Sequence, residues 1–181
     1  MSRPFVVIGI LVCCSFIPAV EAREHMTSSP ASTLSIEWRF DHPPALVWRA
    51  WTDPEWIAGW VGSDPNGTVL NVRTDVRPEG HFEFTFADSD GTVHTARGVY
   101  GTVDPNRRLT FSWAWASEPG VETSITVALT AEGTGTLMHF DHSGLGHATS
   151  HDYGVGWRST FKKVQQLIER QARMAESETR L

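Results

Sequence analysis

The stretch YGVGWRSTFKKVQQLI, residues 153–168, decides the fold. Its large apolar side chains recur at steps of four and three residues, which is the repeat of one face of an α-helix. They are Tyr153, Trp157, Phe161, Val164 and Ile168. The opposite face is charged or polar from Arg158 to Glu169. The pattern predicts a long amphipathic helix, from near His147 to about Met174, whose aromatic stripe must be buried against another element.

The segments before this helix have the two-residue period of β-strands. Apolar and polar residues alternate in TLSIEWRF (33–40), TVLNVRTDV (68–76), HFEFTF (81–86) and LTFSWAW (109–115). Further strands are expected at TVHTARGVYGTVD (92–104), ITVAL (125–129) and TLMHF (136–140), separated by turn residues. Pro44 and Pro54 suit the first turns of two short helices after the first strand, and the second helix is expected to end at Gly62. The sequence therefore predicts an α+β domain: a strand, two short helices, a curved antiparallel sheet of about six further strands, and a long C-terminal helix that the sheet grips.

The length of 181 residues suits a single domain, expected at 33–174 and followed by a polar tail at 175–181. Residues 1–32 are expected to lie outside it as a signal-like or mis-started segment plus a linker. The apolar run at 5–20 precedes Val20-Glu21-Ala22, which is the layout of a secretory signal. We expect a secreted or periplasmic protein if residues 1–22 are a signal peptide, and a cytoplasmic one if translation starts at Met26. The run is too short to favour a stable membrane span.

Charge and cysteine content exclude several classes of partner. The net charge of -6 and the scattered Lys and Arg residues argue against a nucleic-acid partner. Both cysteines, Cys13 and Cys14, lie in the apolar run, so the folded part has no disulfide framework and no thiolate metal site. We expect no cofactor.

A segment rich in histidine and aspartate raises the question of a metal site. It contains His139, Asp141, His142, His147, His151 and Asp152. His147 and His151 are four residues apart, as two ligands on one helix face would be. Strand parity, however, turns His139 and Asp141 to solvent while His142 faces inward with Phe140. A zinc site needs three or four converging ligands, so we expect none.

The aromatic residues of the strands and of the helices face one another and are expected to enclose an apolar chamber. The candidate lining residues are Trp48, Trp56, Trp60, Phe84, Phe86, Phe111, Trp113, Trp115, Met138, Phe140, Tyr153, Trp157 and Phe161. The alternative is that these rings simply form the core, since large aromatic side chains need no ligand to justify their burial.

Polar groups within the strands are the candidates for acid-base chemistry. They are Asp75, Glu83, Arg97, Glu122 and His142. Parity turns Glu83 to the solvent side and His142 to the interior, so His142 is the weak catalytic candidate. No spacing marks a particular pair of these residues.

Four motifs resemble a known family in their order and spacing: TDPEWIAGWVG (52–62), GHFEF (80–84), DPNRRLTFSW (104–113) and HSGLG...GWRSTFKKVQQLI (142–168). Together they are similar to the bacterial homologues of the heat-shock-protein-90 ATPase activator, within the START-like (SRPBCC) superfamily. The resemblance covers residues 34–170. It implies a helix-grip fold with an apolar cavity between the sheet and the C-terminal helix, in which hydrophobic small molecules bind or are processed. The eukaryotic co-chaperones of this kind carry an additional domain, for which this chain has no room.

Three hypotheses follow. The leading one is a START-like domain, without catalysis or with weak catalysis, that binds a small hydrophobic ligand of lipid-like or polyketide-like character and has a role in a stress response. The second is a cyclase-like or aromatase-like enzyme that acts on an aromatic or polyketide-type substrate in the same cavity. The third is a co-chaperone-like module with a protein partner. The oligomeric state stays open between a monomer and a homodimer.

Overall fold

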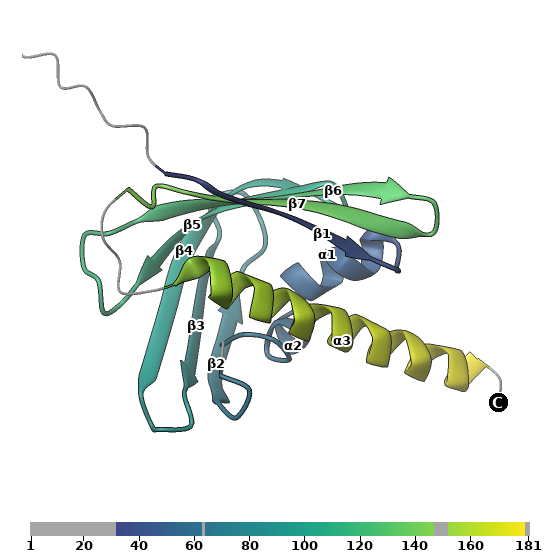
Figure 1. The fold of residues 1–181 in the computed structure, drawn as a ribbon, viewed down its shortest axis with the longest axis horizontal. Helices are drawn as coiled ribbons and strands as arrows, with labels where there is room; N and C mark the ends of the chain where they lie inside the picture. The colour runs from purple at the N-terminus through teal and green to yellow at the C-terminus, as the bar shows by residue number, and fades with distance from the viewer. Residues whose placement is uncertain (1–31, 63, 147–151, 180–181) are drawn as a thin grey trace, which may run out of the picture.

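The computed structural model describes residues 32–62, 64–146 and 152–179 (Figure 1). In chain order the elements are β1 (Leu34–Phe40), α1 (Pro44–Thr52), α2 (Pro54–Ile57), β2 (Thr68–Thr74), β3 (His81–Ala87), β4 (Val93–Asp104), β5 (Arg108–Trp115), β6 (Thr123–Glu132), β7 (Gly135–Ser143) and α3 (Tyr153–Thr179). This order confirms the predicted α+β succession, with six strands after the two short helices. Within the described ranges, none of the helices combines the length and the apolar character that a membrane span requires.

Proline and aspartate define the two short helices. Pro44 lies in the first turn of α1, where its missing N–H costs nothing. Asp53 ends α1 and caps α2, since its side chain accepts a hydrogen bond from the Glu55 N–H at 3.0 Å. After α2 the chain turns at Gly62, whose φ of +88° is a left-handed conformation that favours glycine.

The seven strands form one antiparallel sheet in the order β1-β7-β6-β5-β4-β3-β2. Strands β2 to β7 follow one another as neighbours, whereas β1 pairs with β7 from Leu34↔His142 to Phe40↔Thr136. Register shifts within β2 and within β4 are the kind of irregularity that bends a strand. Figure 1 shows the sheet curving around α3, with β1, β6 and β7 running in a different direction from β2, β3 and β4.

Small residues on the inner face of β4 let aromatic rings from its two neighbours meet. Ala96 and Gly98 lie opposite Phe84 and Phe82 of β3. A Cβ on Gly98 would lie 1.9 Å from the Ser112 carbonyl oxygen and 2.7 Å from the Phe82 ring, so only glycine fits there. Across this gap the Phe82 ring lies 5.5 Å from Phe111 and 5.8 Å from Trp113 of β5, measured between centroids. The concave face of the sheet is therefore covered with aromatic rings.

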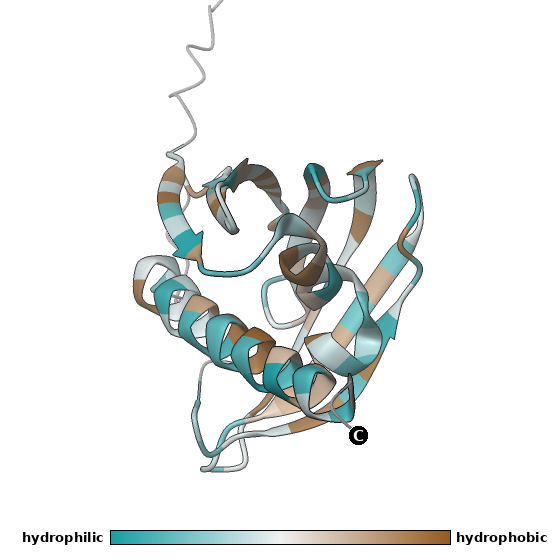
Figure 2. Cartoon of the chain, turned by 90° about the vertical axis from the view of Figure 1, so that its right-hand side faces the viewer, coloured by the Kyte–Doolittle hydropathy of each residue, from teal (hydrophilic) through white to brown (hydrophobic). Residues whose placement is uncertain are grey.

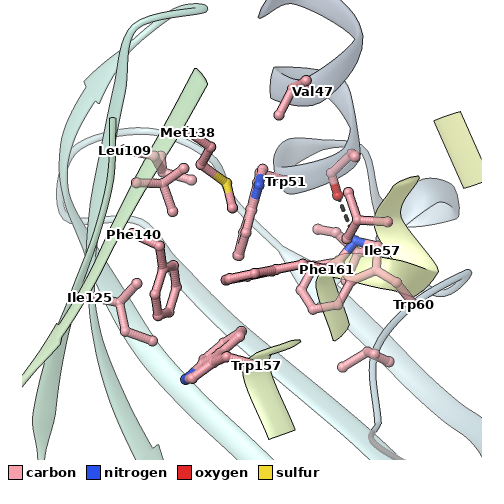
Figure 3. Close-up of a cluster of buried hydrophobic side chains, with 14 of the residues drawn as sticks. Val47, Trp51, Ile57, Trp60, Leu109, Ile125, Met138, Phe140, Trp157 and Phe161 are labelled. Atoms are coloured by element: carbon pink, nitrogen blue, oxygen red, sulfur yellow. Dashed lines mark hydrogen bonds between the residues drawn. The ribbon is translucent and has the colours of Figure 1, made fainter. Parts of the chain in front are cut away.

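Trp51 of α1 fills the middle of the space between sheet and helix. It is 3% exposed. Its ring centroid lies 6.1 Å from Phe140 of the sheet and 6.3 Å from Phe161 of α3. Figure 3 shows it among the buried side chains of both. The predicted chamber is therefore packed at its centre, because an indole from α1 occupies it.

The long helix is amphipathic as predicted, but its bounds differ from the prediction. Phe161, Val164 and Ile168 are fully buried, and Figure 2 shows hydrophilic and hydrophobic residues alternating along α3. The helix begins at Tyr153 and ends at Thr179, and 147–151 lie outside the described residues. Residues 175–179, expected in a polar tail, thus continue the helix. Ala and Glu favour a helix without needing burial, so the end of the apolar stripe did not mark the end of the helix.

Candidate ligand-binding groove

A groove remains open at one end of the packed interior. It encloses about 420 Å³, within the usual range of small-molecule pockets. It lies between the first two turns of α3, the strands β3 to β5 and the loop after α2. Its lining residues are Trp60, Val61, Gly62, Phe86, Asp88, His94, Trp113, Trp115, Asp152, Tyr153, Val155, Gly156, Trp157, Ser159 and Thr160.

The structure divides the predicted lining residues into two groups. Those that line the groove are Trp60, Phe86, Trp113, Trp115, Tyr153 and Trp157. Those that do not are Trp48, Trp56, Phe84, Phe111, Met138, Phe140 and Phe161. Of the second group, all but the half-buried Trp48 belong to the buried core. The reason is Trp51, which the candidate set omitted and which fills the chamber that these residues surround.

Three of the four groove-lining indoles donate hydrogen bonds within the protein. Trp60 Nε1 donates to the Ala50 carbonyl oxygen at 2.7 Å, Trp115 Nε1 to the Tyr153 hydroxyl at 3.0 Å, and Trp157 Nε1 to His142 at 3.0 Å. Trp113 is 5% exposed, and its buried Nε1 has no hydrogen-bond partner among the described residues. An unpaired buried donor costs about 1–3 kcal/mol, so the Trp113 N–H is an unsatisfied polar group in the groove wall.

His142, the catalytic candidate, is fully buried and faces inward as strand parity predicted. Its Nδ1 accepts from Trp157 Nε1, a group that can only donate. Its Nε2 lies 2.7 Å from Thr123 Oγ1, which in turn donates to the Trp113 carbonyl oxygen. This series of hydrogen bonds fixes His142 as the neutral tautomer with the proton on Nε2. Burial also lowers its pKa to about 4.

These contacts assign His142 a structural role. Trp157 belongs to α3, Thr123 to β6 and Trp113 to β5, so the imidazole links the helix to the sheet directly behind the groove. Both ring nitrogens are engaged, and His142 is not among the residues that line the groove. The arrangement therefore argues against its use as a general base.

Asp88 and His94 form a polar pair in the groove that the sequence interpretation missed. Asp88 Oδ2 lies 2.9 Å from His94 Nε2, and Asp88 Oδ1 is buried with no hydrogen-bond partner among the described residues. The signal was present in the DSDG turn at 88–91. A tight hairpin there pairs Phe86 with His94, so His94 joins Phe82, Phe84 and Phe86 on the inner face.

The rim of the groove near Gly62 is fastened to two other elements. Lys163 of α3 donates from Nζ to the carbonyl oxygens of Gly62 and Asp64 at 2.7 and 3.1 Å. Burial lowers the pKa of Lys163, against the attraction of Asp64 and Asp88. Asp64 Oδ2 accepts from the Ser89 hydroxyl and N–H, at 2.6 and 2.8 Å, and these bonds lower its pKa to about 2. The loop after α2 is thus joined to both α3 and the β3–β4 turn.

The other polar candidates do not enter the groove. Glu83, Arg97 and Glu122 line a shallow hollow on the outer face of the sheet, and Asp75 forms an ion pair with Arg77 at 2.8 Å. His147 and His151 lie outside the described residues. Within the described ranges no three His, Cys, Asp or Glu side chains gather closely enough to hold a metal ion.

A family model matches most of the chain, and several solved structures share its fold. The family model of Activator of Hsp90 ATPase homolog 1-like protein matches residues 41–169. Among solved structures, a putative uncharacterized protein from Rhizobium leguminosarum is 29% identical with a TM-score of 0.68, and the match covers 77% of this chain and 95% of that one. An AHSA1-like protein from Aeromonas hydrophila is 22% identical with a TM-score of 0.68, covering 78% and 94%. CalU16 from Micromonospora echinospora is 28% identical with a TM-score of 0.57, covering 82% and 83%. No curated protein matches the chain.

Proposed function

Because the chain belongs to the family of Activator of Hsp90 ATPase homolog 1-like proteins, we propose that it binds a small, largely apolar molecule in the groove between α3 and the sheet. The volume of about 420 Å³ suits such a ligand. Six of the fifteen lining residues are Trp, Phe or Tyr, so burial of apolar ligand surface supplies the main driving force. Ligands of lipid-like or polyketide-like character are the first classes to test. A role in a stress response is proposed from the family alone.

The observation that carries this proposal is the unpartnered N–H of Trp113. The other three indoles of the groove satisfy their N–H groups within the protein. A ligand with one acceptor oxygen, such as a carbonyl or hydroxyl group, satisfies the fourth. The ligand we propose is therefore a ring system with at least one hydrogen-bond acceptor, rather than a pure hydrocarbon.

A titration with 2-acetylnaphthalene, followed by the indole N–H signals in ¹H–¹⁵N NMR spectra, tests the proposal. We expect the signals of Trp113, Trp115 and Trp157 to move. Gly156 offers a blocking variant, because none of the described residues lies within 4 Å of a Cβ placed there. In Gly156→Leu the new side chain occupies the groove, so affinity should fall between about fivefold and about 150-fold, as an overpacking cost of about 1–3 kcal/mol implies.

Gly154→Leu is the matched control. It makes the same substitution one half-turn earlier in α3, at a residue that does not line the groove, and among the described residues a Cβ there meets Asp152 Oδ1 alone, at 3.5 Å. Equal binding by the two variants would show that the ligand lies elsewhere. The absence of any signal change with a broader panel of planar ketones would refute the proposal.

A second function, acid-base catalysis, is favoured by the Asp88–His94 pair. A carboxylate that orients an imidazole beside an apolar groove is an arrangement used for proton transfer. The cyclase-like hypothesis therefore moves from His142 to this pair. Hydrogen-deuterium exchange at the methyl group of 2-acetylnaphthalene tests it. An exchange rate unchanged by the protein, or equal with wild type and His94→Gln, would dismiss it.

No comparable observation favours the protein-interaction hypothesis. The exposed large apolar side chains among the described residues are Leu70, Val93, Val155 and Met174. They come from β2, β4 and the two ends of α3, rather than from one element.

A further inference from the structure

We infer that the ligand of the groove carries a positively charged amine. This inference rests on the proposed function and adds to it the charge and chemical class of the ligand. Three features of the groove support it: the signs of the charges in its wall, an unused carboxylate oxygen, and the aromatic faces beside that carboxylate.

The charges that line the groove are negative. Asp88 and Asp152 are lining residues, and no Lys or Arg is among the described lining residues. Asp152 accepts from the Val155 N–H at 3.0 Å, so its charge is balanced by the N-terminus of α3. Lys163 faces the neighbouring hollow, where two backbone carbonyl oxygens hold its ammonium group. Asp88 also lines that hollow and attracts Lys163, so its charge is partly balanced, but it is the carboxylate of the groove wall that a ligand would meet.

One oxygen of the Asp88 carboxylate is without a hydrogen-bond partner among the described residues. Its Oδ2 is engaged with His94 at 2.9 Å, whereas its buried Oδ1 has no partner among the described residues. An ionised carboxylate can only accept hydrogen bonds, so the missing partner is a donor. An ammonium N–H is the donor that gains most there, because hydrogen bonds between charged groups are the strongest kind.

The aromatic wall beside Asp88 also favours a cation. The face of an aromatic ring carries negative potential, and Trp binds cations best among the aromatic side chains. The Trp113 and Trp115 rings lie 5.4 Å apart with an interplanar angle of 87°, so their faces point in different directions around the groove. Phe86 lies 6.1 Å from Trp115. The same features disfavour a carboxylate or phosphate group on the ligand.

A matched set of probes tests the inference by isothermal titration calorimetry. The amine is 2-(1-naphthyl)ethylamine, the neutral match is 2-(1-naphthyl)ethanol, and the anion is 1-naphthylacetate. The amine should bind at least about tenfold more tightly than the alcohol, as a cation over Trp beside a carboxylate implies. The anion should bind more weakly than the alcohol. Added salt should weaken binding of the amine and leave the alcohol unchanged.

Asp88→Asn should lower the affinity for the amine about tenfold and change that for the alcohol less than about twofold. Asp104→Asn is the matched control, because it removes the same charge from the far end of β4, ten residues from His94 and at most about 33 Å away along a bent strand. The Asp104 carboxylate forms an ion pair with Arg107 at the surface, at 3.7 Å. Equal losses in the two variants would attribute the preference to net charge and overturn the inference.

The outcomes separate the two proposals. Binding of the alcohol or the anion as tightly as the amine, blocked by Gly156→Leu, overturns the inference and leaves the proposed function standing. Failure of all three probes and of 2-acetylnaphthalene to bind overturns both. Binding of the amine that Gly156→Leu does not affect overturns the inference, because the amine then lies outside the groove.

Discussion

Because His142 is neutral in the folded domain, the free energy of unfolding depends on pH. In the unfolded chain the imidazole takes up a proton below about pH 6.5. In the folded domain burial lowers its pKa to about 4. Between these two values only the unfolded chain is protonated, so the free energy of unfolding is full above about pH 6.5 and falls as the pH drops towards 4.

The size of this effect follows from the two pKa values. At about 1.36 kcal/mol per pH unit, the interval from 6.5 to 4 corresponds to about 3 kcal/mol of stability. That is a large part of the roughly 5–15 kcal/mol that stabilises a typical domain. The hydrogen bonds act in the same direction, since a proton on Nδ1 would face the Trp157 N–H, a donor.

Urea unfolding at a series of pH values tests this prediction in wild type and in His142→Asn. The asparagine does not titrate, and its Oδ1 can still accept from Trp157 Nε1. We expect the variant to be less stable near neutral pH, because the bond to Thr123 is lost, but to lose about 3 kcal/mol less than wild type between pH 6.5 and 4.

His139→Gln is the control for the His142 experiment. His139 is the neighbouring histidine on the same strand, but it is exposed, with Nδ1 3.3 Å from Glu37. Replacing His139 should leave most of the pH dependence of the free energy of unfolding unchanged. A constant stability difference between wild type and His142→Asn at every pH would refute the reasoning, and so would an NMR titration of the His142 ring with a midpoint near 6.5.

Two further predictions concern the packing. Gly98→Ala should lower the free energy of unfolding, measured with urea, by about 1–3 kcal/mol or more, because the new Cβ collides with the Ser112 carbonyl oxygen and the Phe82 ring. An unchanged urea midpoint would contradict the tight approach of β4 to its neighbours. Trp51→Ala should lower the free energy of unfolding by about 3–5 kcal/mol and extend the groove into the centre of the domain. The variant that stays folded should therefore bind larger aromatic ligands. If calorimetry finds no change in the preferred ligand size, the core has collapsed into the space instead.

The sequence predicted the elements because their periods are local. Alternation within each strand and the four-and-three repeat of α3 depend only on neighbouring residues, and the parity that placed His142 inside is equally local. The centre of the interior is different. Whether side chains fill the space between the sheet and α3 depends on where α1 lies in the folded domain. Trp51 reaches that space from a helix only nine residues long.

The candidate site was predicted in part for the same reason. Of the candidate lining residues, those in the wall of the groove are Trp60, Phe86, Trp113, Trp115, Tyr153 and Trp157. Asp88 and His94 were missed because a turn and a strand were interpreted separately, although the register of the hairpin between them brings the two residues together. Hairpin register is the sequence signal that would have identified the pair.

The pairing of β1 with β7 also determines when the domain can be completed during synthesis. Leu34 pairs with His142, so more than a hundred further residues must be synthesised before β1 can pair with β7. Until then Ile36 and Phe40, both buried in the finished domain, are exposed on the nascent chain. Pairings this distant in sequence close slowly, since the entropy of a long loop must be lost first. The apolar face of β1 is thus exposed on the nascent chain until β7 has been synthesised.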